Sequence, residues 1–220
     1  MIRNFYNAES KYVVSRDVNL NGHDYVDLDL PSRTLWATMN VGASLPMDTG
    51  LYFQWGDVQG YTEDQVGDIE CKKAFSWMDY KFSIKGSNEN FSKYTTTGAT
   101  LDLEDDAANA NMGGDWHMPT PEQFKELINE TDNTWTTQDG INGRLFTSKT
   151  DTSKSIFIPA AGYAWNGSLY DVGRSGFVWS SMLSAYDVSS GQYLSFDSGD
   201  VYLYNYGYRY YGFSVRGVLG

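Results

Sequence analysis

The chain of 220 residues is poor in the residue types that most enzymes depend on. It contains one cysteine, Cys71, and two histidines, His23 and His117. A single cysteine cannot form a disulfide within the chain or build a cysteine-rich metal site. No Gly-x-Ser-x-Gly segment is present, so His117 has no serine nucleophile of that type to activate. We therefore expect a non-enzymatic protein with no cofactor and no metal, in which His117 has a structural role.

Basic residues and long apolar runs are scarce as well. The 16 Lys and Arg stand against 28 Asp and Glu, which gives a formal net charge of −12. Nucleic-acid binding depends on an excess of positive charge to neutralise phosphates, so that class is excluded. No run of eighteen apolar residues is present, and we expect no membrane insertion. The first residues do not have the pattern of a signal peptide. We expect a cytoplasmic protein, or one that reaches a virion or bacterial surface by another route.

What the chain does contain is typical of a globular domain. Hydrophobic residues make up 41% of it, including seven Trp, and it has seventeen Tyr. The pattern predicts an N-terminal arm or edge strand over residues 1–20 and one domain over residues 21–220. Short strands are expected at 25–30, 35–42 and 51–56, an irregular loop region over 57–100, and short strands and turns from 134 onward. Together with two helices, this predicts an α+β fold.

The two predicted helices cover residues 103–111 and 120–128. The first has acidic residues in its first turn, where the helix dipole favours negative charge. The second has Thr120 as N-cap, Pro121 at the first helical position and Gln123 at the reciprocal position of a capping box. The acidic cluster at 102–106 could also ligate a hard cation such as calcium, but the helix dipole explains it without a metal.

The most informative segment covers residues 186–212. Of its 27 residues, 20 are Tyr, Ser, Asp, Asn or Gly, and eight are Tyr. No Lys follows Lys154 and no Glu follows Glu130, although an ordinary acidic surface uses both freely. Tyr with small polar neighbours is the composition of antibody combining sites, because Tyr offers a large contact area and a hydroxyl at low entropic cost.

Apolar residues alternate with this polar set, which predicts a sheet with two different faces. We expect a buried back face made of Trp179, Leu194, Phe196, Val201, Leu203, Phe213 and Val215. The candidate ligand-binding residues on the front are Tyr186, Asp187, Ser189, Ser190, Tyr193, Ser195, Asp197, Asp200, Tyr202, Tyr204, Asn205, Tyr206, Tyr208, Tyr210 and Tyr211. The alternative is an ordinary aromatic hairpin whose tyrosines pack on neighbouring loops.

The genetic code suggests how this composition could arise. Replacing the adenines of the Asn codon AAC yields codons for Tyr, Ser, Asp and Gly, but never for Lys, Glu, Gln, Trp or Met. The tract is therefore what adenine-directed mutagenesis would leave behind. Gln192 cannot be reached in this way, and we assign it to the scaffold.

Several motifs resemble a known family over most of residues 20–220. They occur at 21–28, 35–43, 52–56, 105–108, 114–120, 157–162 and 209–218, and they are similar to the Fibrobacter-type major paralogous domain. That family is related to the formylglycine-generating-enzyme branch of the C-type lectin fold. The resemblance therefore implies a C-type lectin-like fold with short antiparallel strands, two helices and long ordered loops.

A narrower resemblance concerns the end of the chain. Trp179-Ser180-Ser181, the tract itself and residues 212–216 are similar to members of that family, common in gut bacteria and their phages, that are variable proteins of diversity-generating retroelements. In those proteins a reverse transcriptase replaces adenines in the coding segment. The resemblance implies a hypervariable ligand-binding segment at 180–212, as in an adhesin that binds an unknown protein or glycan on another cell or virion surface.

The chain also differs from the families that it resembles, and these differences argue against some of their functions. The oxidase relatives carry a cysteine pair near the C-terminus that is absent here, and Gly217 stands where family members often have Cys or Pro. The Glu-Pro-Asn and Trp-Asn-Asp motifs of calcium-dependent lectins are missing; Trp165-Asn166-Gly167 is only a fragment. Calcium-independent carbohydrate binding, a structural surface or virion module, and less plausibly a glycosidase remain as alternatives. Cys71, beside two lysines, is interpreted as an inert thiol.

Overall fold

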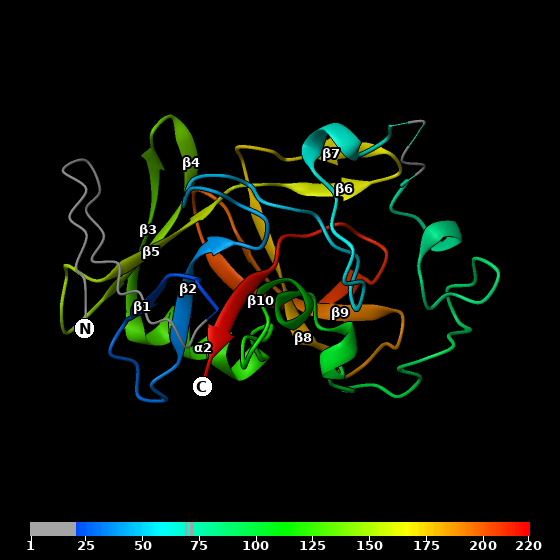
Figure 1. Cartoon of the computed structure of the whole chain (residues 1–220), viewed down its shortest axis with the longest axis horizontal. Coiled ribbons are helices and arrows are strands. Elements are labelled where there is room, and N and C mark those ends of the chain that lie inside the picture. The colour runs from blue at the N-terminus through cyan, green and yellow to red at the C-terminus, as the bar shows by residue number, and fades with distance from the viewer. Residues whose placement is uncertain (1–20, 69, 71–72) are drawn as a thin grey trace.

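A computed structural model describes residues 21–68, 70 and 73–220. Within them the chain folds into small antiparallel sheets with two α-helices (Figure 1), which confirms the α+β prediction at that level. The arm expected over residues 1–20 and Cys71 lie outside the described residues. Among the helices that the structure describes, none is long and apolar enough to cross a membrane.

The first sheet joins the beginning and the end of the described chain. Its strands are β1 (Tyr25–Asp27), β2 (Leu35–Asn40) and β11 (Arg216–Leu219), with β2 in the centre. β1 ends earlier than predicted because Asp29 has a φ of 57°, which an extended strand cannot accommodate. The strand expected at 51–56 is reduced to single bridges at Tyr52 and Phe53, and Trp55 and Gly56 form a turn.

The irregular region predicted over residues 57–100 is confirmed for its described residues. They contain two short 3₁₀ turns, η2 (Glu63–Gln65) and η3 (Trp77–Asp79), and isolated bridges. The carboxylate of Asp79 accepts hydrogen bonds from the backbone N–H groups of Ala74, Phe75 and Ser76. Phe75 is fully buried. Side-chain hydrogen bonds and buried aromatic residues therefore fix this region without regular secondary structure.

The helix predicted at 120–128 is confirmed as α2 (Pro121–Glu130), which ends two residues later than expected. Thr120 and Gln123 form the predicted capping box, and Phe124 and Leu127 are buried. The prediction of one helix over 103–111 is wrong. A 3₁₀ turn, η4 (Leu103–Asp105), precedes a separate α1 (Ala107–Met112). Asp106 between them is extended, and its carboxylate caps α1 by accepting from the N–H of Asn109.

Ten residues after the start of α2 the chain enters a run of hairpins. The second sheet contains β3 (Thr131–Gln138), β4 (Ile141–Ser148) and β5 (Ser155–Pro159). β3 begins before residue 134, and β3 and β4 are longer than the short strands expected there. A two-stranded hairpin, β6 (Tyr163–Trp165) and β7 (Ser168–Tyr170), follows. Asn166 and Gly167 both have positive φ at its turn, as a tight hairpin requires.

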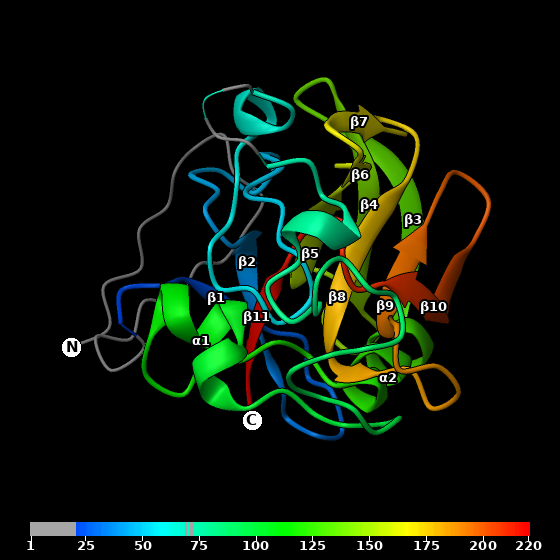
Figure 2. The ribbon, with the colours of Figure 1, turned by 90° about the vertical axis from the view of Figure 1, so that its right-hand side faces the viewer.

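The sheet that carries the candidate site has the strand order β10-β9-β8. Its strands are β8 (Gly176–Leu183), β9 (Ser190–Phe196) and β10 (Val201–Tyr208). Figure 2 shows β10 on the outside of this sheet. On the inner side, single bridges from Ser214 to Val178 and from Phe213 to Phe53 continue the sheet into the core.

Large buried clusters pack against both faces of this sheet, which corrects the predicted back face. Leu194 and Phe196 of β9 pack with Phe124 and Leu127 of α2. Val201 and Leu203 of β10, predicted to be buried, are half-buried at the rim of that cluster. Trp179, Phe213 and Val215 belong to the opposite cluster. Trp179 is paired with Tyr193, and directly paired residues point to the same side of a sheet. The side of the sheet that carries Tyr193 therefore packs on a buried cluster of its own.

Candidate functional site: a tyrosine surface

Five tyrosines of the C-terminal tract have exposed rings. The exposed fraction of the side chain is 72% for Tyr186, 48% for Tyr202, 43% for Tyr204, 61% for Tyr206 and 42% for Tyr208. We call these five residues the tyrosine surface. Large exposed aromatic groups gathered in one region are unusual for a monomer and typical of an interaction site.

The pairing of β9 with β10 explains why these rings point outward. Tyr202 is paired with Ser195 and Tyr204 with Tyr193, whereas Leu203 is paired with Leu194 in the core behind the sheet. Because side chains alternate between the two faces of a strand, burial of the leucines directs the tyrosines to the other face. The predicted two-faced hairpin is confirmed for this part of the tract.

A register shift between Tyr204 and Gly207 interrupts the alternation in β10. Such a bulge bends the strand and redirects side chains. Tyr206 stacks on Tyr186, with ring centroids 6.2 Å apart. Tyr208 turns toward Trp77, whose ring centroid is 6.0 Å away. The bulge thus spreads the exposed rings over a wider area than a regular strand would.

Tyr193 and Tyr211 lie at the base of the tyrosine surface and are only partly exposed. Their ring centroids are 5.0 Å and 5.8 Å from that of the buried Phe213. Burial, with a smaller contribution from Tyr204, raises the pKa of Tyr193 to about 12. Burial also raises the pKa of Tyr211. Both hydroxyls stay neutral across the physiological range, so this base is uncharged.

Three of the fifteen predicted site residues are buried, and their expected exposure is wrong. Ser189 and Ser190 donate hydrogen bonds to the carboxylate of the half-buried Asp187, and so stabilise the turn before β9. Tyr210 packs with its ring centroid 4.7 Å from that of Trp77 and is only 8% exposed. Of the others, Ser195 and Asn205 are half-buried.

Asp197 and Asp200 are exposed, but they lie at the turn between β9 and β10. The Asp197 carboxylate accepts from the backbone N–H groups of Gly199 and Asp200. Asp200 is hydrogen-bonded to the hydroxyl of Tyr202, which raises the pKa of that tyrosine. Both aspartates line an open groove of about 850 Å³, together with Trp135, Asn142, Asp171, Gly173, Arg174, Ser175, Ser198 and Gly199.

Aromatic residues outside the tract, which were not among the predicted site residues, extend the surface. Tyr163 of β6 stacks on Tyr170 of β7 with centroids 5.4 Å apart, and it also contacts Phe177 and Tyr211. Trp165 contacts Tyr170 and Tyr211. Alternating aromatic residues on both sides of Asn166-Gly167 predict a hairpin. Its position beside the tract depends on tertiary structure and has no signal in the sequence.

Two scaffold residues within the tract hold it in place. Gln192, assigned to the scaffold from the codon argument, is buried and donates to the carbonyl of Leu183. Arg209 is fully buried, with its guanidinium carbon 4.2 Å from the centre of the Phe91 ring. It donates to the carbonyl oxygens of Lys93 and Tyr94. These contacts attach the end of β10 to the irregular region.

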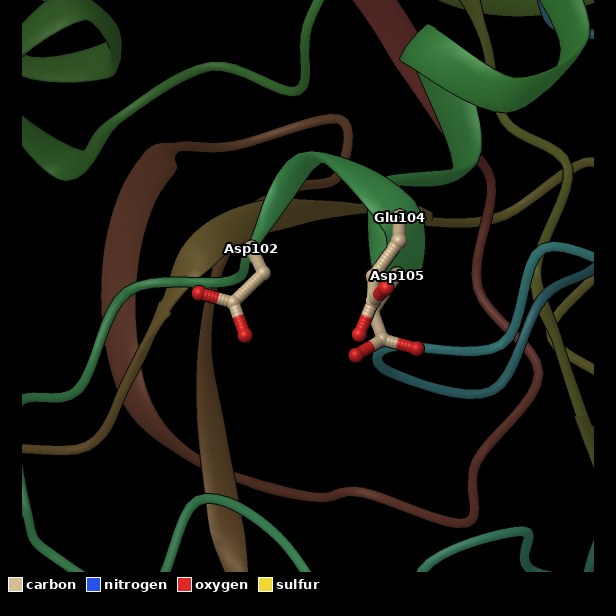
Figure 3. A group of neighbouring side chains, drawn as sticks. All are labelled: Asp102, Glu104 and Asp105. Atoms are coloured by element: carbon tan, nitrogen blue, oxygen red, sulfur yellow. The ribbon is translucent and has the colours of Figure 1, made fainter.

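The carboxylates of the acidic cluster are paired with a lysine side chain of the same protein. Figure 3 shows Glu104 and Asp105 of η4 together with Asp102, the residue just before η4. The ammonium of Lys93 lies 2.7 Å, 2.8 Å and 2.5 Å from their respective carboxylates. Lys81 also pairs with Asp105 at 2.6 Å. A lysine therefore occupies the position that a metal would take, and ion pairing, with Asp106 as helix cap, explains these acids better than the predicted helix dipole.

His117 lies among backbone groups. Its Nδ1 is 3.0 Å from the carbonyl oxygen of Met118, and its Nε2 is 3.4 Å from that of Gly220. Its own N–H and carbonyl pair with Val218 of β11. The residue thus ties the end of the chain to the segment before α2.

Comparisons with known proteins give no relative for this chain. No family model, no curated protein and no solved structure matches it.

Proposed function

We propose that this protein is a non-enzymatic ligand-binding protein that uses the tyrosine surface as its binding face. The observation that supports this most strongly is the arrangement of β10, in which Tyr202 and Tyr204 are exposed while Val201 and Leu203 pack toward the core. Tyrosine rings supply contact area and hydroxyl groups for recognition at little entropic cost. The fold is proposed to be C-type lectin-like, and the partner to be a protein or glycan on another cell or virion surface.

The proposal includes diversification of the segment 180–212. A surface can vary only where substitutions leave the fold intact, and exposed positions meet that condition because their substitutions cost less than about 0.5 kcal/mol. Tyr202, Tyr204 and Tyr206 are such positions. Leu194 and Arg209 are fully buried and are expected to stay constant.

DNA sequence tests the diversification directly. We expect a near-copy of the last coding segment beside a reverse-transcriptase gene, with adenines at the codons of the exposed residues. The codons of Leu194, Phe196 and Arg209 should be identical in both copies. A genome with no such copy would contradict diversification, while leaving ligand binding by the tyrosine surface open to the next test.

Binding is tested with a triple variant, Tyr202→Ser, Tyr204→Ser and Tyr206→Ser. Wild type and variant are screened against a glycan array and a displayed random-peptide library, and their melting temperatures are compared. We expect wild type to select ligands that the variant does not bind, at nearly equal melting temperatures. A control variant, Glu122→Ser, Lys125→Ser and Glu130→Ser on α2, changes exposed positions elsewhere and should bind like wild type. Equal binding by the tyrosine variant would contradict the proposal.

A further inference from the structure

The outer edge of β10 carries no further strand among the described residues. There, β10 is the last strand of its sheet and pairs with β9 alone. In the part of the chain that the structure describes, no other strand pairs with its outer edge. The strand contains no Lys and no Pro, the residues that commonly protect a sheet edge from pairing. The outward carbonyl of Tyr208 accepts from the N–H of Tyr211, and the outward N–H and C=O groups of the preceding part of the strand are available to another extended chain.

From this edge and from the charge around it, we propose that the ligand of the tyrosine surface is an extended, basic polypeptide segment that adds a strand to β10. This inference rests on the proposed function and specifies its ligand. An extended peptide supplies backbone donors and acceptors at strand spacing, whereas a glycan has no such ladder. Every second side chain of the added strand would then lie beside Tyr202 and Tyr204.

The charge near the tyrosine surface favours a basic partner. The exposed carboxylates of Asp171, Asp197 and Asp200 line the groove at the end of the β9–β10 hairpin, and Arg174 is the one cation among its lining residues. Arg209 and Arg216, the other basic residues after Lys154, are fully buried, and Arg144, which interacts electrostatically with Asp197 and Asp200, is buried as well, so the three carboxylates outnumber the exposed cations here. A partner rich in Lys and Arg therefore meets attraction here, and an acidic partner meets repulsion.

The aromatic rings add a second attraction for cations. Inside the protein, aromatic rings are used as cation partners: Lys73 lies 5.2 Å from the centre of the Tyr61 ring, and Arg209 lies over Phe91. Among the described residues, no such cation contact is found on any of the five rings of the tyrosine surface. Tyr186 stacks on Tyr206 and Tyr204 stacks on Tyr193, so the ring faces turned away from these stacks are the ones open to Lys and Arg side chains of a partner.

The experiment selects twelve-residue peptides from a displayed random library with the wild-type protein at low salt. We expect the selected peptides to be enriched in Lys and Arg over the starting library and to lose affinity as salt is raised. Neutral or acidic selected peptides would overturn the basic part of the inference. Selection of no peptide, or glycan-array binding alone, would overturn the polypeptide ligand.

Matched variants test whether the carboxylates of the groove attract the peptide. One variant combines Asp171→Asn, Asp197→Asn and Asp200→Asn. It should bind a selected basic peptide about tenfold more weakly than wild type, which corresponds to about 1.4 kcal/mol of binding free energy. The control, Asp115→Asn, Glu122→Gln and Glu130→Gln, changes the net charge equally at exposed positions away from the groove and should leave affinity within about twofold, or roughly 0.4 kcal/mol. If both variants weakened binding equally, the attraction would depend only on the net charge of the protein, and the inference would be contradicted.

Backbone methylation tests strand addition. Alternate N–H groups of an extended peptide point to the same side. Two versions of a selected peptide, N-methylated at the odd or at the even positions, should therefore differ: one version loses binding and the other keeps it. Equal binding by both versions would overturn strand addition. If the peptides bind the Tyr202→Ser, Tyr204→Ser, Tyr206→Ser variant as well as wild type, the proposed function itself fails, independently of the peptide's charge and backbone.

Discussion

Trp179 and Phe213 stack on each other with ring centroids 4.1 Å apart and an interplanar angle of 28°. The indole N–H of Trp179 also donates to the carbonyl of Phe53 at 2.8 Å. Tyr193 lies against both rings, at 6.0 Å and 5.0 Å. The stack is therefore the rigid layer beneath the base of the tyrosine surface.

Truncation of Phe213 should damage both stability and the surface. We expect Phe213→Ala to lower the free energy of unfolding by about 3–5 kcal/mol, as for other buried aromatic residues, because it leaves a cavity beside Trp179. Phe213→Leu keeps part of the volume and should cost less. Urea unfolding followed by tryptophan fluorescence measures both. A loss below about 1 kcal/mol for the alanine variant would show that the stack contributes little to folding.

The side on which Trp179 lies could not be predicted from the sequence. Phe177, Val178 and Trp179 form a continuous apolar run, so the alternation that assigns faces in β9 and β10 is absent. The alternation of Phe213 and Val215 shows that they share a face, but not which one. That depends on the bridge between Ser214 and Val178, which is a tertiary contact.

Elements that depend only on neighbouring residues in the sequence were predicted well. The capping box at Thr120 and Gln123 fixed the start of α2, and period-two alternation identified the β9–β10 hairpin. The bulge after Tyr204 has no comparable signal, since Tyr continues to alternate through Tyr208 and Tyr210. The composition of residues 204–211 instead predicted an exposed Tyr-rich loop that includes Tyr210. That prediction is wrong, because β10 extends to Tyr208 and Tyr210 is buried.

The same substitution should destabilise the protein far more at Tyr210 than at Tyr206. Tyr206 is 61% exposed, so Tyr206→Ser should change stability by no more than about 0.5 kcal/mol. Tyr210 contacts Trp77 and Tyr211 at 4.7 Å and 4.8 Å, and Tyr210→Ser should cost about 3 kcal/mol or more. Thermal unfolding separates them, because each kcal/mol shifts the melting temperature of a chain this size by about 2–4 °C. Equal melting temperatures would mean that Tyr210 is not packed as described.

Asp105 should make stability depend on acid pH. Burial alone would raise its pKa, but hydrogen bonds from Lys81, Lys93 and Tyr94 outweigh burial and hold the pKa below its usual range. A carboxyl with a lowered folded pKa contributes stability above its unfolded pKa of about 4, and that contribution is lost as the pH falls through the folded pKa. Asp105→Asn should therefore be less stable by about 1–3 kcal/mol at pH 7, with the difference shrinking below about pH 4.

Urea unfolding at several pH values between 7 and 2 measures this difference. Asp115→Asn, at an exposed position, serves as the control and should follow wild type. A constant gap between wild type and Asp105→Asn over the whole range would contradict the role of the Lys81 and Lys93 ion pairs.

Gly207 should be necessary for the base of the tyrosine surface. A Cβ placed at this position would lie 2.8 Å from the ring of Tyr193 and 3.0 Å from that of Trp179, closer than carbon atoms normally approach. Because Trp179 is already stacked on Phe213, its ring has little freedom to move away. Gly207→Ala should thus cost about 1–3 kcal/mol and displace Tyr193. Gly199→Ala in the exposed β9–β10 turn, where the nearest atom is the Asp197 carboxylate at 3.3 Å, is the control and should be nearly neutral. Urea unfolding gives the cost, and the chemical shifts of the Tyr193 ring in NMR spectra report its displacement; unchanged shifts with unchanged stability would show that β10 does not press on Tyr193 in solution.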